Sequence, residues 1–418
     1  MKRALAMIAF AAAACARAPN APREAPLSAA ATAEQRYLGD ESSRRRSLEA
    51  SLVNPENGYS ALRLAHYASG TSDDWDLLPE YNPKAAPFAT PTEALAPLTI
   101  SAAARAGDPE ALRALGEAAF SRYPVQNALA AERLVKDETS AKRFGFWVDG
   151  GRIGGLVHVE TPDGMRHLSY SCSTCHGGIR GGKLVTGVGS DTLDIGRLTV
   201  AAFPSSSDAL LDWGPGRVDV TTNAGTEPVR IPDLRAVRDL AFLHHDGTLA
   251  QNDVTTLAIR IETLVIVSNS KTIRPPREVA LGLAIYLWSI ERLIPKRDSV
   301  TDSEKHGGAL FATHCASCHV PPRYSGPSVA LAEIGTDPHL GQSSDRGTGT
   351  YRVPSLRGVA TRGPLLHDAS VQTPHELLDP ARLAPGYDGR RGPIQGHRYG
   401  LDLGREERTD LEAFLMTL

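Results

Sequence analysis

Cys172-Ser173-Thr174-Cys175-His176 recurs in this chain of 418 residues as Cys315-Ala316-Ser317-Cys318-His319. The pattern C-x-x-C-H is the attachment signal of a c-type haem. Two thiols at this spacing reach both vinyl groups of one porphyrin as thioethers, and the imidazole that follows takes one axial position on the iron. We therefore expect two covalently bound haems, each held by the two cysteines and the histidine of one stretch.

Two disulfides, a zinc site and a thioredoxin-like redox pair are the alternative uses of a C-x-x-C spacing. A zinc site needs further Cys or His ligands at fixed spacing. A redox pair does not require a histidine directly after the second cysteine, and here that histidine is present twice. Haem attachment explains every fixed position of both stretches.

Composition is that of an ordinary globular protein, with 41% hydrophobic and 22% charged residues. The length predicts two or three domains, and the net charge of −3 gives no reason to expect a nucleic-acid partner. Residues 1–15 resemble an export signal, because a basic start precedes an apolar segment, Ala4 to Ala14, that is too short to span a bilayer. We expect the protein in the periplasm.

The fifth cysteine, Cys15, lies where this apolar segment ends. One interpretation is lipidation of Cys15, which would anchor the protein to a membrane without crossing it. The other is ordinary cleavage after Ala14-Cys15-Ala16, which would remove the thiol. A free cysteine is uncommon outside the cytoplasm, and this favours the lipoprotein.

The order of the chain predicts a mainly α fold with two tandem cytochrome c-like haem domains, short β-hairpins and an N-terminal helical extension. Within the extension, the segment from Pro109 to Gly116 has helical periodicity, and Gly116 is expected near its end. The segments 156–160 and 165–170 alternate like two strands. The expected divisions are a linker at 16–36, the extension at 37–148, and haem domains at 149–298 and 299–418.

A repeat supports the tandem arrangement. Arg230-Ile231-Pro232-Asp233-Leu234-Arg235 returns 122 residues later as Arg352-Val353-Pro354-Ser355-Leu356-Arg357. A His-Asp pair follows each copy, at His245-Asp246 and His367-Asp368, and a long apolar-periodic segment comes after it. The Gly-rich stretch 177–189 admits two interpretations, close passage of the backbone over a macrocycle or plain turns.

The second axial position of each iron decides its chemistry. Outside the export signal the chain has only two methionines, Met165 and Met416, and Met416 lies in an apolar helical pattern that indicates packing. The chain therefore offers few methionines that could be the second axial ligand of an iron in a His/Met pair. For the second haem the best candidate is His397, between glycines in a predicted loop, although a loop histidine is often only solvated.

From about Ser169 to Leu418 the chain resembles the bacterial dihaem cytochrome c peroxidase superfamily, and within it the dihaem rubber-oxygenase-like branch. In that branch the histidine of a late Gly-His motif is the distal ligand of the second haem. The resemblance thus implies that His397 makes this haem a six-coordinate electron-transfer centre with a lower potential than His/Met ligation gives. The matching segments are Tyr170 to Gly178, Gly214 to Asp219, Tyr351 to Arg357, Pro364 to Val371, Glu376 to Leu378, Gly396 to Gly400 and Ala413 to Leu418.

For the first haem the resemblance implies a site where peroxide or oxygen reacts. The superfamily commonly has Trp-Asp-Gly where this chain has His245-Asp246-Gly247. His244 or His245 could therefore be a distal ligand or a general acid, or the His-Asp pair could be a structural hydrogen bond. Glu262 is the nearest downstream carboxylate that could act as a peroxidatic acid, and its alternative is a surface position on a helix.

We expect a haem oxidoreductase of the cytochrome c peroxidase type. A small redox protein or a quinol-linked donor would exchange electrons with the second haem, and the first would reduce peroxide or activate oxygen. The competing hypothesis is a non-enzymatic electron carrier in which both irons are six-coordinate.

Overall fold

A computed structural model describes residues 31–68, 80–89, 96–161, 164–219, 221, 227–269, 273–290, 299–389 and 392–418. The expected export signal, Cys15 and most of the expected linker lie outside these residues. The linker ends earlier than predicted, because helix α1 (Ala33–Gly39) is capped at Thr32 and begins inside the stretch 16–36. Within the described residues, no helix combines the length and the apolar character that a membrane span requires.

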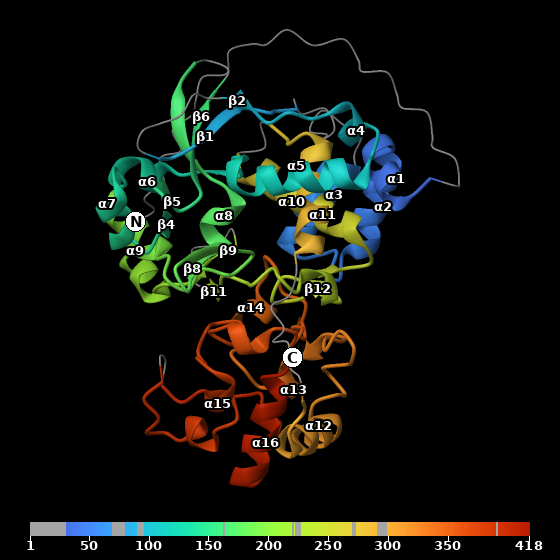
Figure 1. Cartoon of the computed structure of the whole chain (residues 1–418), viewed down its shortest axis with the longest axis vertical. Helices are drawn as coiled ribbons and strands as arrows, with labels where there is room; N and C mark the ends of the chain where they lie inside the picture. Colours follow the sequence, from blue (N-terminus) through green and yellow to red (C-terminus); the bar gives the residue numbers. More distant parts are fainter. Residues whose placement is uncertain are drawn as a thin grey trace.

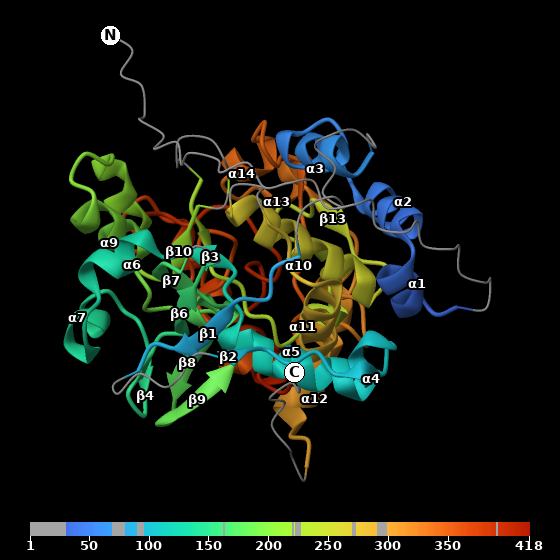
Figure 2. The same ribbon diagram turned by 90° about the horizontal axis from the view of Figure 1, so that it is seen from above.

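Helices account for 42% of the structure and strands for 14%, so the mainly helical class is confirmed. The N-terminal part is built around helix α5 (Pro109–Arg122), which packs along α11 (Arg277–Ser289), as Figure 2 shows. The N-terminal helices besides α1 and α5 are α2 Glu41–Ser51, α3 Gly58–Ala68, α4 Ala102–Arg105, α6 Leu129–Leu134 and α7 Glu138–Arg143.

The expectation that Gly116 lies near a helix end is wrong. Helix α5 continues through Gly116 to Arg122, and both Leu112 and Leu115 are buried on one face of it. A Cβ atom built on Gly116 would lie 1.9 Å from the carbonyl oxygen of Gly282 in α11. Gly116 is therefore required by the close crossing of two helices and not by a stop signal.

The predicted strands at 156–160 and 165–170 are present as β6 (Leu156–Glu160) and β7 (Arg166–Tyr170), paired antiparallel. They are the centre of a five-stranded sheet in the order β2-β1-β6-β7-β3. The outer strands come from the N-terminal part, so the sheet crosses the division expected at residues 148 and 149. They are β1 Lys84–Pro87, β2 Ala96–Pro97 and β3 Gln126–Asn127.

The region from 148 to 290 contains the first C-x-x-C-H stretch, whose cysteines delimit the one-turn helix α8 (Cys172–Cys175). The Gly-rich stretch that follows it contains a hairpin of β8 and β9. The remaining elements of this region are β4 Val148–Asp149, β5 Arg152–Ile153, β8 Gly177–Arg180, β9 Lys183–Thr186, α9 Ile195–Ala202, η2 Asp208–Trp213, β10 Arg217–Val218, β11 Val229–Arg230, η3 Val237–Asp239, β12 Phe242–Leu243, β13 Leu249–Ala250 and α10 Val254–Ser268.

The C-terminal residues form the lower part of the molecule in Figure 1, around the packed pair α12 (Asp302–His314) and α16 (Arg405–Leu415). Their own apolar core joins Phe311, Leu411 and Leu415, and it is separate from the cores above. The other elements are β14 Val329–Ala330, α13 Leu331–Ile334, α14 His339–Gln342, β15 Thr350–Tyr351, η4 Val359–Thr361, α15 Pro374–Leu377 and η5 Pro380–Leu383. The division expected between residues 295 and 302 lies largely outside the described residues.

Candidate haem sites

The cysteines of both C-x-x-C-H stretches are free thiols, and this statement covers every cysteine among the described residues. Burial raises the pKa of the Cys175 thiol and of the Cys315 thiol to about 11, so both are protonated at neutral pH. Cys172 packs on the core of the α5–α11 pair, and Cys175 packs on the neighbouring core below the sheet. The thiols are thus held inside the protein and unpaired, as thioether formation requires.

His176 is oriented by the repeated R-x-P-x-L-R segment. Its Nδ1 lies 3.0 Å from the carbonyl oxygen of Pro232. Burial lowers the pKa of this imidazole to about 4, so the ring is neutral. A neutral ring that donates Nδ1–H to a carbonyl presents an unprotonated Nε2, which is the atom that binds a metal. The first copy of the repeat therefore prepares His176 to ligate an iron.

His319 is prepared in the same manner in the second half. Its Nδ1 lies 3.2 Å from the carbonyl oxygen of Tyr324, and the carbonyl of Pro354 in the second copy of the repeat also acts on the ring. Burial again lowers the pKa of the imidazole to about 4. The two proline carbonyls explain why the repeat contains a proline at its third position: that carbonyl faces the histidine of the attachment stretch.

His397 faces His319 across a gap. The centroids of the two rings are 6.5 Å apart, and the planes are inclined by 56°. Metal–imidazole bonds are about 2 Å long, so an iron between two imidazoles needs about 4 Å between their facing nitrogens. Subtracting roughly 1 Å for each ring from the centroid distance leaves about that space. The structure brings together the two residues expected to ligate the second iron.

The loop that carries His397 is held by a buried arginine that sequence reasoning missed. Arg382 is fully buried and donates to the carbonyls of Gly396, at 3.0 Å, and His397, at 2.8 Å. Gly396 lies so close to the preceding segment that a Cβ atom would be 2.3 Å from the backbone nitrogen of Thr336. His397 itself has a φ of 42°, an unfavourable value for a non-glycine residue. The glycine before His397 was the available signal; nothing local marked Arg382.

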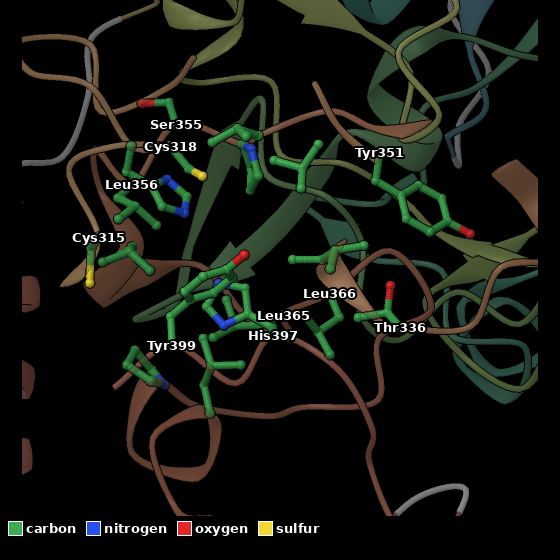
Figure 3. A pocket seen from close by; sticks show the side chains of 18 of the residues that line it. Cys315, Cys318, Thr336, Tyr351, Ser355, Leu356, Leu365, Leu366, His397 and Tyr399 are labelled. Carbon is green, nitrogen blue, oxygen red and sulfur yellow. The ribbon is translucent and has the colours of Figure 1, made fainter. Parts of the chain in front are cut away.

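The gap belongs to a cavity of about 1440 Å³ that includes its open mouth. Figure 3 shows Cys315 and Cys318 on one side of this pocket, with His397 and Tyr399 below them. The walls are mostly apolar, which suits a porphyrin face. The apolar side chains in the lining include Val329, Ile334, Val353, Leu356, Val359, Leu365, Leu366, Leu377, Leu378, Leu411 and Leu415.

Three arginines, Arg230, Arg352 and Arg362, line the same cavity, and no Asp or Glu is among its described lining residues. The Nε of each guanidinium is buried and has no hydrogen-bond partner among the described residues. A buried cation with an unsatisfied N–H is costly, so the cavity suits an occupant that supplies negative charge beside a large apolar body. A haem with its propionate carboxylates fits that description, and the cysteines and histidines are in place to hold it.

His244 and His245 point into different surroundings. The ring of His245 lines the second cavity, and its Nε2 lies 3.0 Å from the carbonyl oxygen of Arg230. His244 instead packs edge-on against Tyr59, with centroids 5.0 Å apart, and its Nε2 accepts a hydrogen bond from Nε of Arg260. Arg260 also lies close enough to His176 to lower its pKa. The structure therefore associates His244, and not His245, with the first attachment stretch.

The His244 imidazole is neutral, because burial lowers its pKa and the nearby guanidinium groups of Arg260, Arg346, Arg63 and Arg352 add to the effect. Since Nε2 accepts a hydrogen bond from Arg260, Nδ1 must carry the proton. No partner for Nδ1 exists among the described residues. His244 has a φ of 62°, and so does Leu366, which lies 122 residues later at the equivalent position of the repeat and lines the second cavity.

Glu262 is not the surface residue that one interpretation expected, because it is fully buried. Its Oε2 accepts a hydrogen bond of 2.9 Å from the hydroxyl of Tyr37 in α1, which ties α10 to the N-terminal helices. Arg260 and Glu262 are two positions apart on α10 and so project from opposite sides of the helix. The structure does not bring Glu262 together with His244.

The His-Asp pairs make no direct hydrogen bond to each other among the described residues. Asp246 accepts from the hydroxyl of Thr248 at 2.6 Å, and Asp368 accepts from the backbone N–H of Ser370 at 3.1 Å. His367 stacks on Tyr351, with centroids 4.3 Å apart. The aspartates thus shape their own turns, and the histidines make separate contacts.

Two attachment stretches with oriented histidines define a dihaem c-type cytochrome class of protein. No family model matches the chain. Among curated proteins, it is similar to the methylamine utilization protein MauG of Methylorubrum extorquens, with 24% identity over 281 residues, or 60% of this chain and 73% of the relative.

Solved structures also match in part. A MauG-like protein associated with microbial copper homeostasis has 19% identity, with 49% of this chain and 78% of that chain covered and a TM-score of 0.35. The diheme peroxidase BthA from Burkholderia thailandensis has 18% identity, with coverages of 80% and 94% and a TM-score of 0.33. The MauG sequence match and the paired motifs give an assignment to the bacterial dihaem cytochrome c peroxidase-like superfamily. This confirms the resemblance at the level of the superfamily; the rubber-oxygenase-like branch stays a prediction.

Proposed function

We propose that this protein is an exported dihaem c-type cytochrome whose C-terminal haem is a six-coordinate electron-transfer centre and whose N-terminal haem reduces peroxide or activates oxygen. The observation that carries the proposal is the pair His319 and His397, neutral rings that face each other at 6.5 Å. When bound, such haems supply one-electron transfer at a fully ligated iron and peroxide or oxygen chemistry at an iron with an open position.

The residues of the second site favour fast, reversible electron transfer. His319 is fixed through Nδ1 by main-chain carbonyls. His397 is fixed by the hydrogen bonds from Arg382 to the carbonyls of its loop, which we call the Arg382 clamp. Neither ring needs to move or to change its proton when charge passes through the site. The apolar walls exclude water, which limits solvent reorganisation.

At the first site we assign the proton chemistry to His244 together with Arg260. The guanidinium of Arg260 fixes the tautomer of His244, so that Nδ1 holds a proton and can donate a hydrogen bond to a bound oxygen atom. The positive charge of Arg260 would stabilise negative charge that develops on the oxygen. Glu262, the acid expected from the chain order, is the alternative, but its contact with Tyr37 favours a structural role.

A second function is favoured by one observation. The buried Nδ1 of His244 has no partner among the described residues. If Arg260 released Nε2 and the ring proton moved from Nδ1 to Nε2, Nδ1 would be free to ligate the first iron and close the site. The protein would then be an electron carrier without catalytic activity.

The electron paramagnetic resonance spectrum of the resting ferric protein separates these functions. We expect one low-spin centre and one high-spin component. A spectrum without any high-spin component would support the carrier. A pyridine haemochrome assay should give two haems per chain, and one haem would refute the dihaem assignment itself.

We also propose a periplasmic location, with export by residues 1–15 and with anchoring through lipidated Cys15 as the favoured form. A small redox protein or a quinol-linked donor is the proposed electron source, with peroxide or oxygen as the small substrate. Mass spectrometry of the mature N-terminus tests the location: a diacylglyceryl group on Cys15 supports the anchor, and an N-terminus beyond residue 16 contradicts it.

A further inference from the structure

The first arginines of the two repeated segments, Arg230 and Arg352, meet where the two halves of the chain join. The backbone N–H of Arg230 donates to the carbonyl of His367 at 2.8 Å, and the backbone N–H of Arg352 donates to the carbonyl of His245 at 3.0 Å. Each copy of the repeat is therefore hydrogen-bonded to the His-Asp segment that follows the other copy. The junction places residues of one half in the walls of the other.

Arg230 shows this exchange most clearly. It belongs to the first half, in β11, yet its side chain lines the cavity of the second half. Only 8% of its surface is exposed. Its Nη1 donates to the carbonyl of Pro364 in the second half. The backbone carbonyl of Arg230 lies 3.0 Å from Nε2 of His245, in the first half. The backbone carbonyl of Arg230 is thus held by its own half and its guanidinium by the second half, so the side chain is not a mobile surface group.

Among the described residues, the guanidinium of Arg230 makes no ion pair with a carboxylate, although Asp233 lies close enough to raise its pKa against the larger lowering by burial. The Nε of Arg230 is buried without an acceptor among the described residues, and the described lining of the cavity contains no carboxylate. Leaving a buried charged donor unsatisfied costs more than leaving a neutral one, and carboxylates are the best partners of a planar guanidinium. We therefore expect the acceptor for the Arg230 guanidinium to be a carboxylate of the molecule that occupies the cavity.

We propose that Arg230, from the first half of the chain, binds a propionate carboxylate of the haem that the second half holds. This inference rests on the proposed function, because that function supplies the haem. Arg352 and Arg362 of the second half line the same cavity, and Arg230 adds a third guanidinium that comes from the first half. The second haem site is therefore completed by the first half, and its reduction potential depends on a residue outside its own half.

Removing the guanidinium leaves a carboxylate uncompensated beside the iron, which favours the ferric state. The test is a redox titration of full-length holoprotein carrying Arg230→Gln, followed at the low-spin bands of the second haem. We expect the ratio of reduced to oxidised haem at a fixed potential to fall roughly tenfold, which is about 59 mV for one electron. Arg230→Lys, which keeps the charge, should recover part of the shift.

Arg238→Gln is the matched control, because Arg238 carries the same charge in the same half but is exposed. It should leave the potential unchanged. A shift in Arg238→Gln equal to that in Arg230→Gln, or no shift in either variant with two haems bound, would overturn the inference. A wild-type potential that changes with the identity of the buffer anion would assign Arg230 to a free anion and would also overturn it.

Haem stoichiometry, measured on the same samples, separates this inference from the proposed function. One haem per wild-type chain refutes the function, whereas two haems with unchanged potentials refute only the role of Arg230. If Arg230→Gln does not fold, a crystal structure of the wild-type holoprotein decides. A propionate oxygen within hydrogen-bond distance of Arg230 supports the inference, and propionates directed elsewhere overturn it.

Discussion

The loop that positions His397 depends on the side chain of Arg382, and replacing that side chain with methionine should free the histidine. Arg382 donates to four main-chain carbonyls, at 2.9 Å (Leu377), 2.7 Å (Ile394), 3.0 Å (Gly396) and 2.8 Å (His397). Methionine keeps the apolar stem but leaves all four acceptors without a donor in the interior.

Hydrogen bonds to a charged group contribute about 1.5–3 kcal/mol each, although four bonds from one side chain are not independent. We expect Arg382→Met to lower the free energy of unfolding by about 3–5 kcal/mol. The two bonds to Gly396 and His397 act directly on the ligand loop. A loss of about 3 kcal/mol there changes the equilibrium between ligated and unligated His397 by roughly a hundredfold.

The assay is the electron paramagnetic resonance spectrum of the ferric variant at matched haem content, together with thermal unfolding. We expect a new high-spin component from the second haem and a lower melting temperature. Arg398→Gln is the control, because Arg398 is the neighbour of His397 but is exposed, and within the described residues its side chain makes one long hydrogen bond, of 3.4 Å, to Gln395. Low-spin spectra and equal melting temperatures in both variants would refute the clamp.

Three further predictions concern ligation, helix packing and proton chemistry. His397→Gly should convert the second haem to high spin, with recovery on addition of imidazole, and an unchanged spectrum would exclude His397 as the ligand. Gly116→Ala should destabilise the protein by about 1–3 kcal/mol, because its Cβ would meet the carbonyl of Gly282 at 1.9 Å. The control is Gly386→Ala, since a Cβ there meets nothing within 4 Å. Glu262→Gln should keep the rate at which peroxide reoxidises the reduced protein, and loss of that rate would restore Glu262 as the acid.

The local part of the site was predictable from the chain alone. The spacing of Cys172, Cys175 and His176 determines covalent geometry over five residues and needs no tertiary information. His397 was marked by its flanking glycines and by family resemblance, and Gly396 does make the close backbone approach that excludes a side chain. Where chemistry depends on adjacent positions, sequence is sufficient.

Contacts between distant segments were not predictable in the same way. Glu262 looked like a surface residue because its partner, Tyr37, is 225 positions away. Gly116 looked like a stop signal because the helix that it contacts lies far along the chain, at Gly282. The repeat at Pro232 was visible, but its purpose was not, since only folding places that carbonyl beside His176. Burial and long-range pairing decided each of these cases.

The two halves differ where their equivalent positions face the haem sites. At the repeat position where both residues have a φ of 62°, the first half has His244 and the second half has Leu366. An apolar residue at that position cannot ligate, so under the proposed function the second iron needs a ligand from elsewhere, and His397 is the proposed one, with its ring centroid 6.5 Å from that of His319. In the first half a polar ring already occupies the equivalent position, and Arg260 holds it in one tautomer. Under the proposed function the second site transfers electrons and the first acts on peroxide or oxygen, and a single exchange between leucine and histidine at this position, with the added loop, would account for that difference.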